Sequence, residues 1–245
     1  MLTLKTPLEK GSKKLINAWA FYDWANSVYS LVVSSAIFPI YFGVLFSDIN
    51  TISFFNYDIK NTAVISFVTA SAFLIVAFIS PILSGIADYI GNKKKFMKIF
   101  VYLGSTSCVG LYWFELETIY IGLLFYFLAL IGLWSSIVFY NSYLPDIAFP
   151  EQQDRVSARG YSYGYIGSVI LLLINLAMVM QPDLFGIEGT SSEASMKAMK
   201  YSFISVGIWW ALFSQYSFYF LPKSNHKVRV TKDIFWNGYK ELRSV

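Results

Sequence analysis

Polar side chains line one side of the first long apolar segment. Asp23, Asn26, Ser27, Ser30 and Ser34 fall within roughly a 100° arc if this segment is a helix. The carboxylate of Asp23 then lies about 10 Å along the axis from the start of the apolar pattern. In such a row it can bind a proton or a polar group of a small molecule, whereas an aspartate at a membrane surface only reaches the lipid headgroups. Both interpretations of Asp23 stay open, while the row as a whole favours a polar cavity.

A second candidate position, Asn141, lies near the end of a later apolar segment. The sequence there reads Tyr140-Asn-Ser-Tyr-Leu-Pro145-Asp146. Proline has no backbone donor and disfavours a helical conformation in the residue before it, so the helix is predicted to stop there. The Asn141 amide can hydrogen-bond the loop backbone or contact a ligand in the same cavity, and we keep both alternatives.

Small residues repeat at helical spacing near residue 160. Gly160, Gly164 and Ser168 are four residues apart, and Gly167 lies beside them. A face of this kind lets another helix approach closely within a lipid bilayer. The spacing therefore favours helix packing over direct contact with a substrate.

The sequence offers few residues for covalent or metal chemistry. Its one cysteine, Cys108, cannot form an internal disulfide, and its one histidine, His226, lies in a basic segment near the C-terminus. A metal site built from cysteine and histidine needs a cluster of such ligands. No Gly-x-x-x-x-Gly-Lys-Ser/Thr loop for nucleotide phosphates is present. We therefore expect no enzyme, no cofactor and no metal.

The elements that must position these residues follow from the composition. Hydrophobic residues make up 56% of the 245 residues and charged residues 14%, whereas globular proteins carry about 25% charged residues. A hydrocarbon layer about 30 Å thick needs roughly 20 apolar residues in a helix. The uncharged stretch at 99–114 is short for a membrane span. The apolar part of this helix becomes longer if Lys98 extends its ammonium to the membrane surface. The chain is thus predicted to be an all-α membrane protein with six transmembrane helices, built on the uncharged stretches 24–47, 61–87, 99–114, 118–145, 160–182 and 201–222.

The distribution of lysine and arginine predicts how these helices are oriented. If the N-terminus is cytoplasmic, 16 of the 19 basic residues lie on the inside, and only Lys60, Lys197 and Lys200 lie outside. Such an excess on one side is typical of cytoplasmic loops. We expect a cytoplasmic segment at 1–15, a membrane bundle at 16–222 and a basic amphipathic cytoplasmic tail at 223–245. The same rule explains the positive net charge without a nucleic-acid partner.

The connection between the second and third uncharged stretches carries a recognisable motif. It contains Gly85, Asp88, Gly91 and Lys93 in a tight hairpin. This combination resembles the loop Gly-x-x-x-Asp-Arg-x-Gly-Arg-Arg of the major facilitator superfamily. The resemblance implies that Asp88 and its neighbours latch a cytoplasmic gate.

Three departures from that loop weaken the expected latch. The first glycine is displaced to Gly85, Tyr89 stands where the family has arginine, and Asn92 replaces a basic residue. Part of the latch therefore stays in question.

Two further stretches narrow the resemblance. Residues 20–27 and 139–146, together with the glycines near 160, look like the vacuolar-effluxer branch of that superfamily, which includes fungal autophagy-related amino-acid exporters. The resemblance implies a fold of twelve helices in two halves, each made of two inverted three-helix repeats. This chain then supplies the first half, and its tail leads toward a seventh helix that is absent. Either the product is truncated, or a second six-helix half or a second copy completes it.

The leading hypothesis is a secondary transporter, or its N-terminal half, that moves a small polar metabolite by alternating access. The resemblance implies amino acids as a substrate. The short loops favour a bacterial inner membrane as the location, or a vacuolar membrane if the protein is eukaryotic. Asp23 is the candidate proton or ligand carboxylate, with Asn26, Ser30, Ser34 and Asn141 as hydrogen-bonding partners in the cavity. The alternative is a non-transporting membrane subunit or an inactive fragment.

Overall fold

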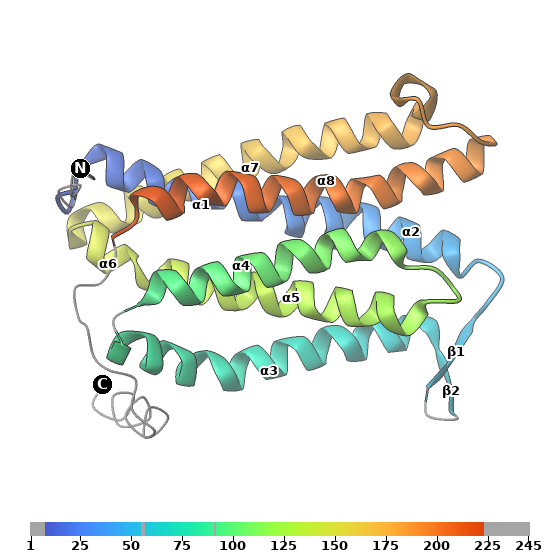
Figure 1. Ribbon diagram of the computed structural model, residues 1–245, viewed down its shortest axis with the longest axis horizontal. Helices are drawn as coiled ribbons and strands as arrows, with labels where there is room; N and C mark the ends of the chain where they lie inside the picture. Colours follow the sequence, from blue (N-terminus) through green and yellow to red (C-terminus); the bar gives the residue numbers. More distant parts are fainter. Residues whose placement is uncertain (1–7, 55–56, 91, 223–245) are drawn as a thin grey trace, which may run out of the picture.

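The computed structural model describes residues 8–54, 57–90 and 92–222, without the side chains of residues 54 and 86–90. The predicted tail at 223–245 and the first seven residues lie outside this description. Within it, the chain forms six long helical segments joined by short connections (Figure 1). The helices α1, α4 and α7 start at one end of the bundle, and α3, α5 and α8 start at the other.

The first helical segment has three parts. It consists of α1 (Lys13–Val28), a π-helical stretch (Tyr29–Ile37) and α2 (Phe38–Leu45). Pro39 is the second residue of α2 and cannot donate a backbone hydrogen bond. Within the wider turns, the Ser35 hydroxyl donates to the Ser30 carbonyl at 2.8 Å. The sequence predicts a regular helix here, so the π-helical turns change which side chains share a face.

A short hairpin interrupts the otherwise helical chain. The strands β1 (Thr51–Phe54) and β2 (Tyr57–Lys60) pair antiparallel, with Thr51 opposite Lys60. The rest of the described chain is helical, as expected of an all-α membrane protein, and this short hairpin is an element that the sequence does not predict. The hairpin leads directly into α3 (Asn61–Ile90).

The later helices end close to the predicted points, but α4, α7 and α8 begin six to ten residues before the uncharged stretches 99–114, 160–182 and 201–222. Asn92 caps α4 (Lys93–Gly110), which continues as a 3₁₀ turn (Leu111–Trp113). The long helix α5 (Ile119–Ser142) ends just before Pro145, which lies in the one-turn helix α6 (Leu144–Ile147). Pro150 opens α7 (Pro150–Met180), and a 3₁₀ turn (Pro182–Phe185) leads to α8 (Ser191–Phe220).

The bundle consists of two groups of helices that meet along α4 and α8. α1 packs against α7 and α8, whereas α5 packs against α3 and α4. α4 and α8 pack against each other and connect the two groups (Figure 1). The core between them is rich in fully buried aromatic side chains, among them Tyr22, Tyr29 and Trp210.

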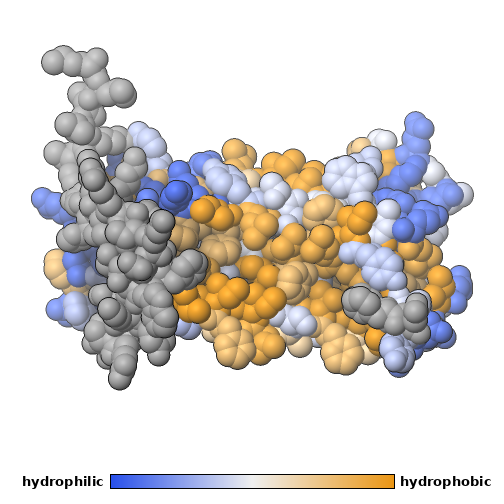
Figure 2. Space-filling view, turned by 60° about the horizontal axis from the view of Figure 1, so that its bottom comes forward, coloured by the Kyte–Doolittle hydropathy of each residue, from blue (hydrophilic) through white to orange (hydrophobic). Residues whose placement is uncertain are grey.

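The surface has an apolar middle and polar ends. Figure 2 shows hydrophobic side chains across the centre of one face, with hydrophilic ones toward both ends. Nine of the twelve lysines and arginines in the described residues lie at the end where α1 begins, here called the basic end; the other three lie at the opposite end, here called the hairpin end. This distribution is typical of a protein that crosses a membrane.

Four of the described helical segments are long and apolar enough to cross a bilayer. They are Lys13–Leu45, Asn61–Gly85, Ile119–Ile147 and Pro150–Met180. α4 and α8 run alongside them in the same bundle but do not meet that criterion of length and composition. The six-span count and the orientation of the termini therefore stay predictions.

Candidate functional site

The carboxylate of Asp23 lies where α1, α5 and α7 approach one another. The Tyr140 hydroxyl, from the end of α5, donates to Asp23 Oδ2 at 2.8 Å. The Asn26 amide, one turn further along α1, lies 3.5 Å from Asp23 Oδ1 and donates to the Tyr22 carbonyl at 3.0 Å. Asp23 is half-buried and Asn26 is buried. Asp23 thus has neutral hydrogen-bond donors from two helices.

Aromatic side chains hold Tyr140 in place. The Trp19 ring stacks on the Tyr140 ring with centroids 4.1 Å apart, and its Nε1 donates to the Tyr140 carbonyl at 2.9 Å. The Tyr22 ring lies 4.9 Å from Tyr140 on another side, and the Tyr22 hydroxyl donates to Ser136 Oγ at 2.7 Å. These contacts fix the hydroxyl that faces Asp23, because both the ring and the backbone of Tyr140 are bound.

The glycines of α7 allow that helix to lie directly on Asp23. A Cβ added at Gly160 would overlap Asp23 Oδ2, and one added at Gly164 would overlap the Ser27 hydroxyl. A Cβ at Gly167 would meet Trp24 at 2.9 Å. Ser168 is buried and donates its hydroxyl to the Gly164 carbonyl within α7. The small-residue face predicted for packing thus lies against α1, on the side that carries Asp23.

No cation neutralises Asp23 among the described residues. Its hydrogen-bond partners there are Tyr140 and Asn26, and it forms no ion pair. The nearby Arg159 donates instead to Asn17 Oδ1 at 2.8 Å. A carboxylate with only neutral donors can hold a proton or bind a positively charged group. The proton or ligand role expected for Asp23 from the sequence stays a prediction.

Three other predicted cavity residues are not gathered around Asp23. Ser30 is exposed and accepts from Ser35 within the π-helical stretch, and Ser34 is half-buried further along. Asn141 is exposed, and within the described chain it forms no hydrogen bond with Asp23. Ser30 and Ser34 lie seven and eleven residues after Asp23 in the same helical segment, so they are about two and three helical turns further along the axis.

The predicted gate loop is described in part. Gly85 is buried in α3, while the Asp88 side chain and Gly91 lie outside the described residues. Lys93 starts α4, and its ammonium contacts Asp146 Oδ2 at 3.2 Å and the Ser142 carbonyl at 3.3 Å. Lys93 thus connects the start of α4 to the turn after α5.

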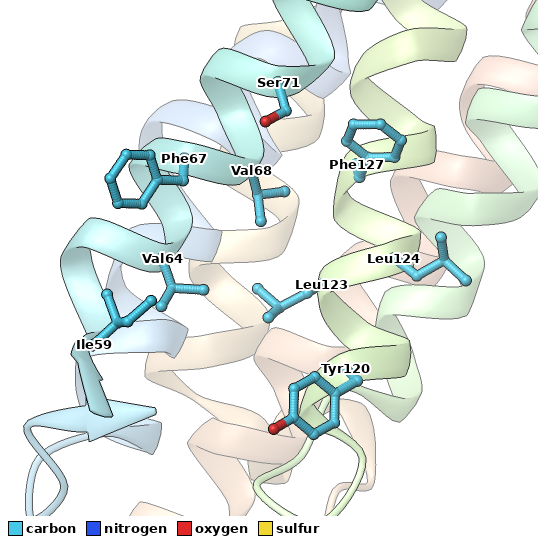
Figure 3. A pocket seen from close by; sticks show the side chains of 9 residues that line it. All are labelled: Ile59, Val64, Phe67, Val68, Ser71, Tyr120, Leu123, Leu124 and Phe127. Atoms are coloured by element: carbon cyan, nitrogen blue, oxygen red, sulfur yellow. The ribbon is translucent and has the colours of Figure 1, made fainter. Parts of the chain in front are cut away.

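An apolar groove of about 360 Å³ lies between α3 and α5 toward the hairpin end (Figure 3). Its few polar atoms include the Tyr120 hydroxyl, which donates to the Ser53 carbonyl of the hairpin. The groove is separate from the Asp23 site and offers little to hold a polar ligand. Its lining side chains are Ile59, Val64, Phe67, Val68, Ser71, Tyr120, Leu123, Leu124 and Phe127.

Two residues of the site are missing from the sequence prediction. Tyr140 enters the sequence analysis only as a residue beside Asn141, and Tyr22 only as part of residues 20–27, yet both contribute to the surroundings of Asp23. Asp146, the partner of Lys93, was also missed. Tyrosine is common at membrane surfaces, because its ring is apolar and its hydroxyl is polar. The residue type alone therefore does not identify a functional site.

Fold and site together define a class of protein. Helices long and apolar enough to cross a bilayer, with a carboxylate enclosed between them, belong to an integral membrane protein, and its relatives are transporters and not enzymes. Over 232 residues the chain is 35% identical to "Uncharacterized MFS-type transporter YxiO" of Bacillus subtilis (strain 168). That alignment covers 92% of this chain and 50% of the relative.

The family model for "Vacuole effluxer Atg22 like" matches residues 11–151 and 149–245, and the chain belongs to this family. It is also 29% identical over 175 residues to an "Uncharacterized protein" of Aquifex aeolicus (strain VF5), covering 70% of this chain and 41% of the relative. The chain thus spans half or less of the length of these relatives. No solved structure matches it.

Proposed function

We propose that this chain is the N-terminal half of a secondary transporter that moves a small polar metabolite by alternating access, with Asp23 as the proton or ligand carboxylate. The observation that carries the proposal is a half-buried carboxylate, bound only by Tyr140 and Asn26, beneath the small-residue face of α7. Amino acids are the first substrates to test, because the matching family is described as vacuole effluxers.

The packing of the long helices supports two inverted three-helix repeats. In such repeats α1 corresponds to α5, α3 to α7 and α4 to α8. Under this correspondence, the contact between α1 and α7 matches the contact between α5 and α3. The contact of α1 with α8 becomes that of α5 with α4, and the contact of α4 with α8 is unchanged. Exchanged helices run in opposite directions along the bundle (Figure 1). This is the arrangement expected of one half of a major facilitator transporter.

The charge distribution supports six spans with the basic end in the cytoplasm. Lysines and arginines gather at the basic end, which fits the positive-inside rule. We propose that α4 and α8 also cross the membrane, since they lie along the other helices over most of the bundle. The location proposed is the plasma membrane of a bacterium.

The test is flux in vesicles that contain the purified chain, alone and with a second six-helix half of the YxiO type. Amino acids are screened under an imposed proton gradient. We expect Asp23→Asn to abolish the pH-dependent part of the flux, because the amide cannot take up or release a proton. The matched control is Asp58→Asn, which removes an exposed carboxylate from β2. Unchanged pH-dependent flux in Asp23→Asn excludes Asp23 from the mechanism.

A second candidate function is a non-transporting membrane subunit. The observation behind it is that Asp23 is already hydrogen-bonded by Tyr140 and Asn26 among the described residues, so this carboxylate can serve helix packing alone. Vesicles with both halves that show no flux of any screened substrate above the empty-vesicle background support this second candidate.

A further inference from the structure

The last turns of α8 are flanked by lysines from two other helices. Lys14 of α1 places its ammonium 4.8 Å from the centre of the Phe220 ring. Lys98 of α4 places its ammonium 5.2 Å from the centre of the Phe218 ring. Because α8 packs against both α1 and α4, the two ammonium groups lie on either side of its end. Each is held over an aromatic ring, which orders a side chain that is otherwise flexible.

These two positive charges are not neutralised within the described residues. Lys14 is exposed, Lys98 is half-buried, and neither forms an ion pair there, whereas Lys93 and Lys200 each pair with a carboxylate. A third lysine lies close by, since the buried Lys94 donates to the Phe218 carbonyl at 2.7 Å. Positive charge therefore accumulates around the end of α8.

The surface between the two lysines is polar near the helix end and apolar further along. Tyr216 and Tyr219 are exposed there, and the Tyr102 hydroxyl donates to Gln215 Oε1 at 3.1 Å. Further toward the middle of α8, Leu212 and Ile208 are exposed by 62% and 55%. Tyrosines at the headgroup level with apolar residues beneath are typical of a membrane surface. One face thus has polar side chains at the headgroup level and an apolar stripe for an acyl chain.

We propose that this surface binds the headgroup of an anionic phospholipid against the exposed end of α8, flanked by Lys14 on one side and Lys98 on the other, with an acyl chain along α8. We call it the α8 lipid patch; it consists of Lys14, Lys98, Tyr102, Gln215, Tyr216 and Tyr219. Charge complementarity selects the occupant, because basic sites between helices near the membrane surface bind acidic headgroups. The proposal requires only a membrane-embedded chain and does not depend on transport.

The test measures lipid binding by native mass spectrometry of the purified 245-residue chain in detergent micelles. Phosphatidylglycerol is titrated against the unaltered chain and the double variant Lys14→Gln, Lys98→Gln, with phosphatidylcholine as the neutral lipid. We expect the variant to bind phosphatidylglycerol roughly 25-fold more weakly, about fivefold for each lysine. Binding of phosphatidylcholine should be unchanged.

The matched control is the double variant Lys13→Gln, Lys95→Gln. It removes the same charge from the same two helices at the basic end, from exposed side chains that contact neither Phe218 nor Phe220. We expect it to bind phosphatidylglycerol as the unaltered chain does. An equal loss in both double variants would mean diffuse attraction to a basic surface and would overturn the proposal.

A second pair of variants keeps the test decisive if the first double variant fails to fold. Lys14→Gln alone alters one exposed side chain in the first turn of α1 and should weaken binding about fivefold. The double variant Lys14→Arg, Lys98→Arg keeps both charges and should retain binding. Full retention of binding in Lys14→Gln, or full loss in the arginine variant, also contradicts the proposal.

Discussion

Asp23 depends on a hydrogen bond that spans 117 residues of sequence. The Tyr140 hydroxyl that donates to it is fixed by stacking on Trp19 and by a hydrogen bond from Trp19 to the Tyr140 backbone. Trp19 and Asp23 are both on α1. The same helix therefore carries the carboxylate and the indole ring that holds Tyr140, the hydrogen-bond donor of that carboxylate. Tyr140 is therefore a positioning residue for Asp23.

Replacing Tyr140 by phenylalanine isolates this hydrogen bond. The ring still stacks on Trp19, but Asp23 Oδ2 loses its donor in a partly buried place. Loss of a hydrogen bond to a charged group costs about 1.5–3 kcal/mol. We expect Tyr140→Phe to lower the unfolding temperature in detergent, measured by tryptophan fluorescence. The control Tyr161→Phe alters an exposed hydroxyl on α7 and should leave it unchanged; equal effects of the two would contradict the assigned role.

At this scale the sequence singles out Asp23 but not its surroundings. A charged residue within a predominantly apolar helix is rare enough to be noticed, and the adjacent Asn26 follows from helical spacing. Tyr140, by contrast, is a common residue type at a helix end, and its role arises from a contact between α1 and α5. In a regular helix Ser30 and Ser34 share a face with Asp23, but they lie about two and three turns further along, where the π-helical stretch interrupts the regular spacing.

At the scale of elements, the packing of α7 on α1 determines how closely α7 approaches Asp23. Gly160 and Gly164 lie over Asp23 and Ser27, with no room for a side chain. The distance between the two helices therefore depends on the absence of a Cβ at these positions. Close approach of this kind is how small residues let helices pack in a membrane.

A single methyl group at Gly164 tests this packing. It would overlap the Ser27 hydroxyl, and overpacking of this kind costs typically about 1–3 kcal/mol. We expect Gly164→Ala to be less stable to heat in detergent, and Ser27→Gly in the same chain to restore most of the loss. The matched control is Gly43→Ala, since a Cβ there has no neighbour within 4 Å. A stable Gly164→Ala, or failure of the second substitution to restore stability, would argue against direct contact at this point.

The long helices themselves are well predicted, whereas two irregular elements are not. Uncharged stretches locate each of the six long segments, because charge interrupts them only near their ends. The hairpin at 51–60 is not predicted, because this connection is short and mixes polar and apolar residues between the long apolar stretches. The π-helical turns before Pro39 depend on how the backbone adjusts locally, which hydrophobic periodicity does not report.

At the scale of the whole molecule, the packing of the helices is symmetric, whereas the distribution of lysines and arginines between the two ends is not. The same pairs of helices are in contact when the first three long helices are exchanged for the last three, although the extent of each contact differs. The lysines and arginines do not follow this exchange, because most of those in the described residues lie at the basic end, whichever group of helices they belong to. Packing symmetry is expected to come from repeated structure, and charge asymmetry from orientation in the membrane.

Labelling of single cysteines from outside the cell tests the orientation. The natural Cys108 is the only cysteine and is buried, so the background reaction should be low. We expect Asp58→Cys and Glu117→Cys, both exposed at the hairpin end, to react with a membrane-impermeant maleimide on intact cells. Lys95→Cys and Glu151→Cys, exposed at the basic end, should react only after the cells are permeabilised.

The pair Lys95→Cys and Glu117→Cys is the sharpest part of this test, because the two positions bracket α4. That helix is 18 residues long, or about 27 Å, and its first turns are rich in lysine, so its composition alone does not identify it as a membrane span. Its packing against α5 and α8 along the bundle is what argues that it crosses. Reaction of both cysteines from the same side would mean that α4 does not cross the membrane. The remaining helices could not then form two equivalent three-helix repeats, and the proposed transport half would be lost with them.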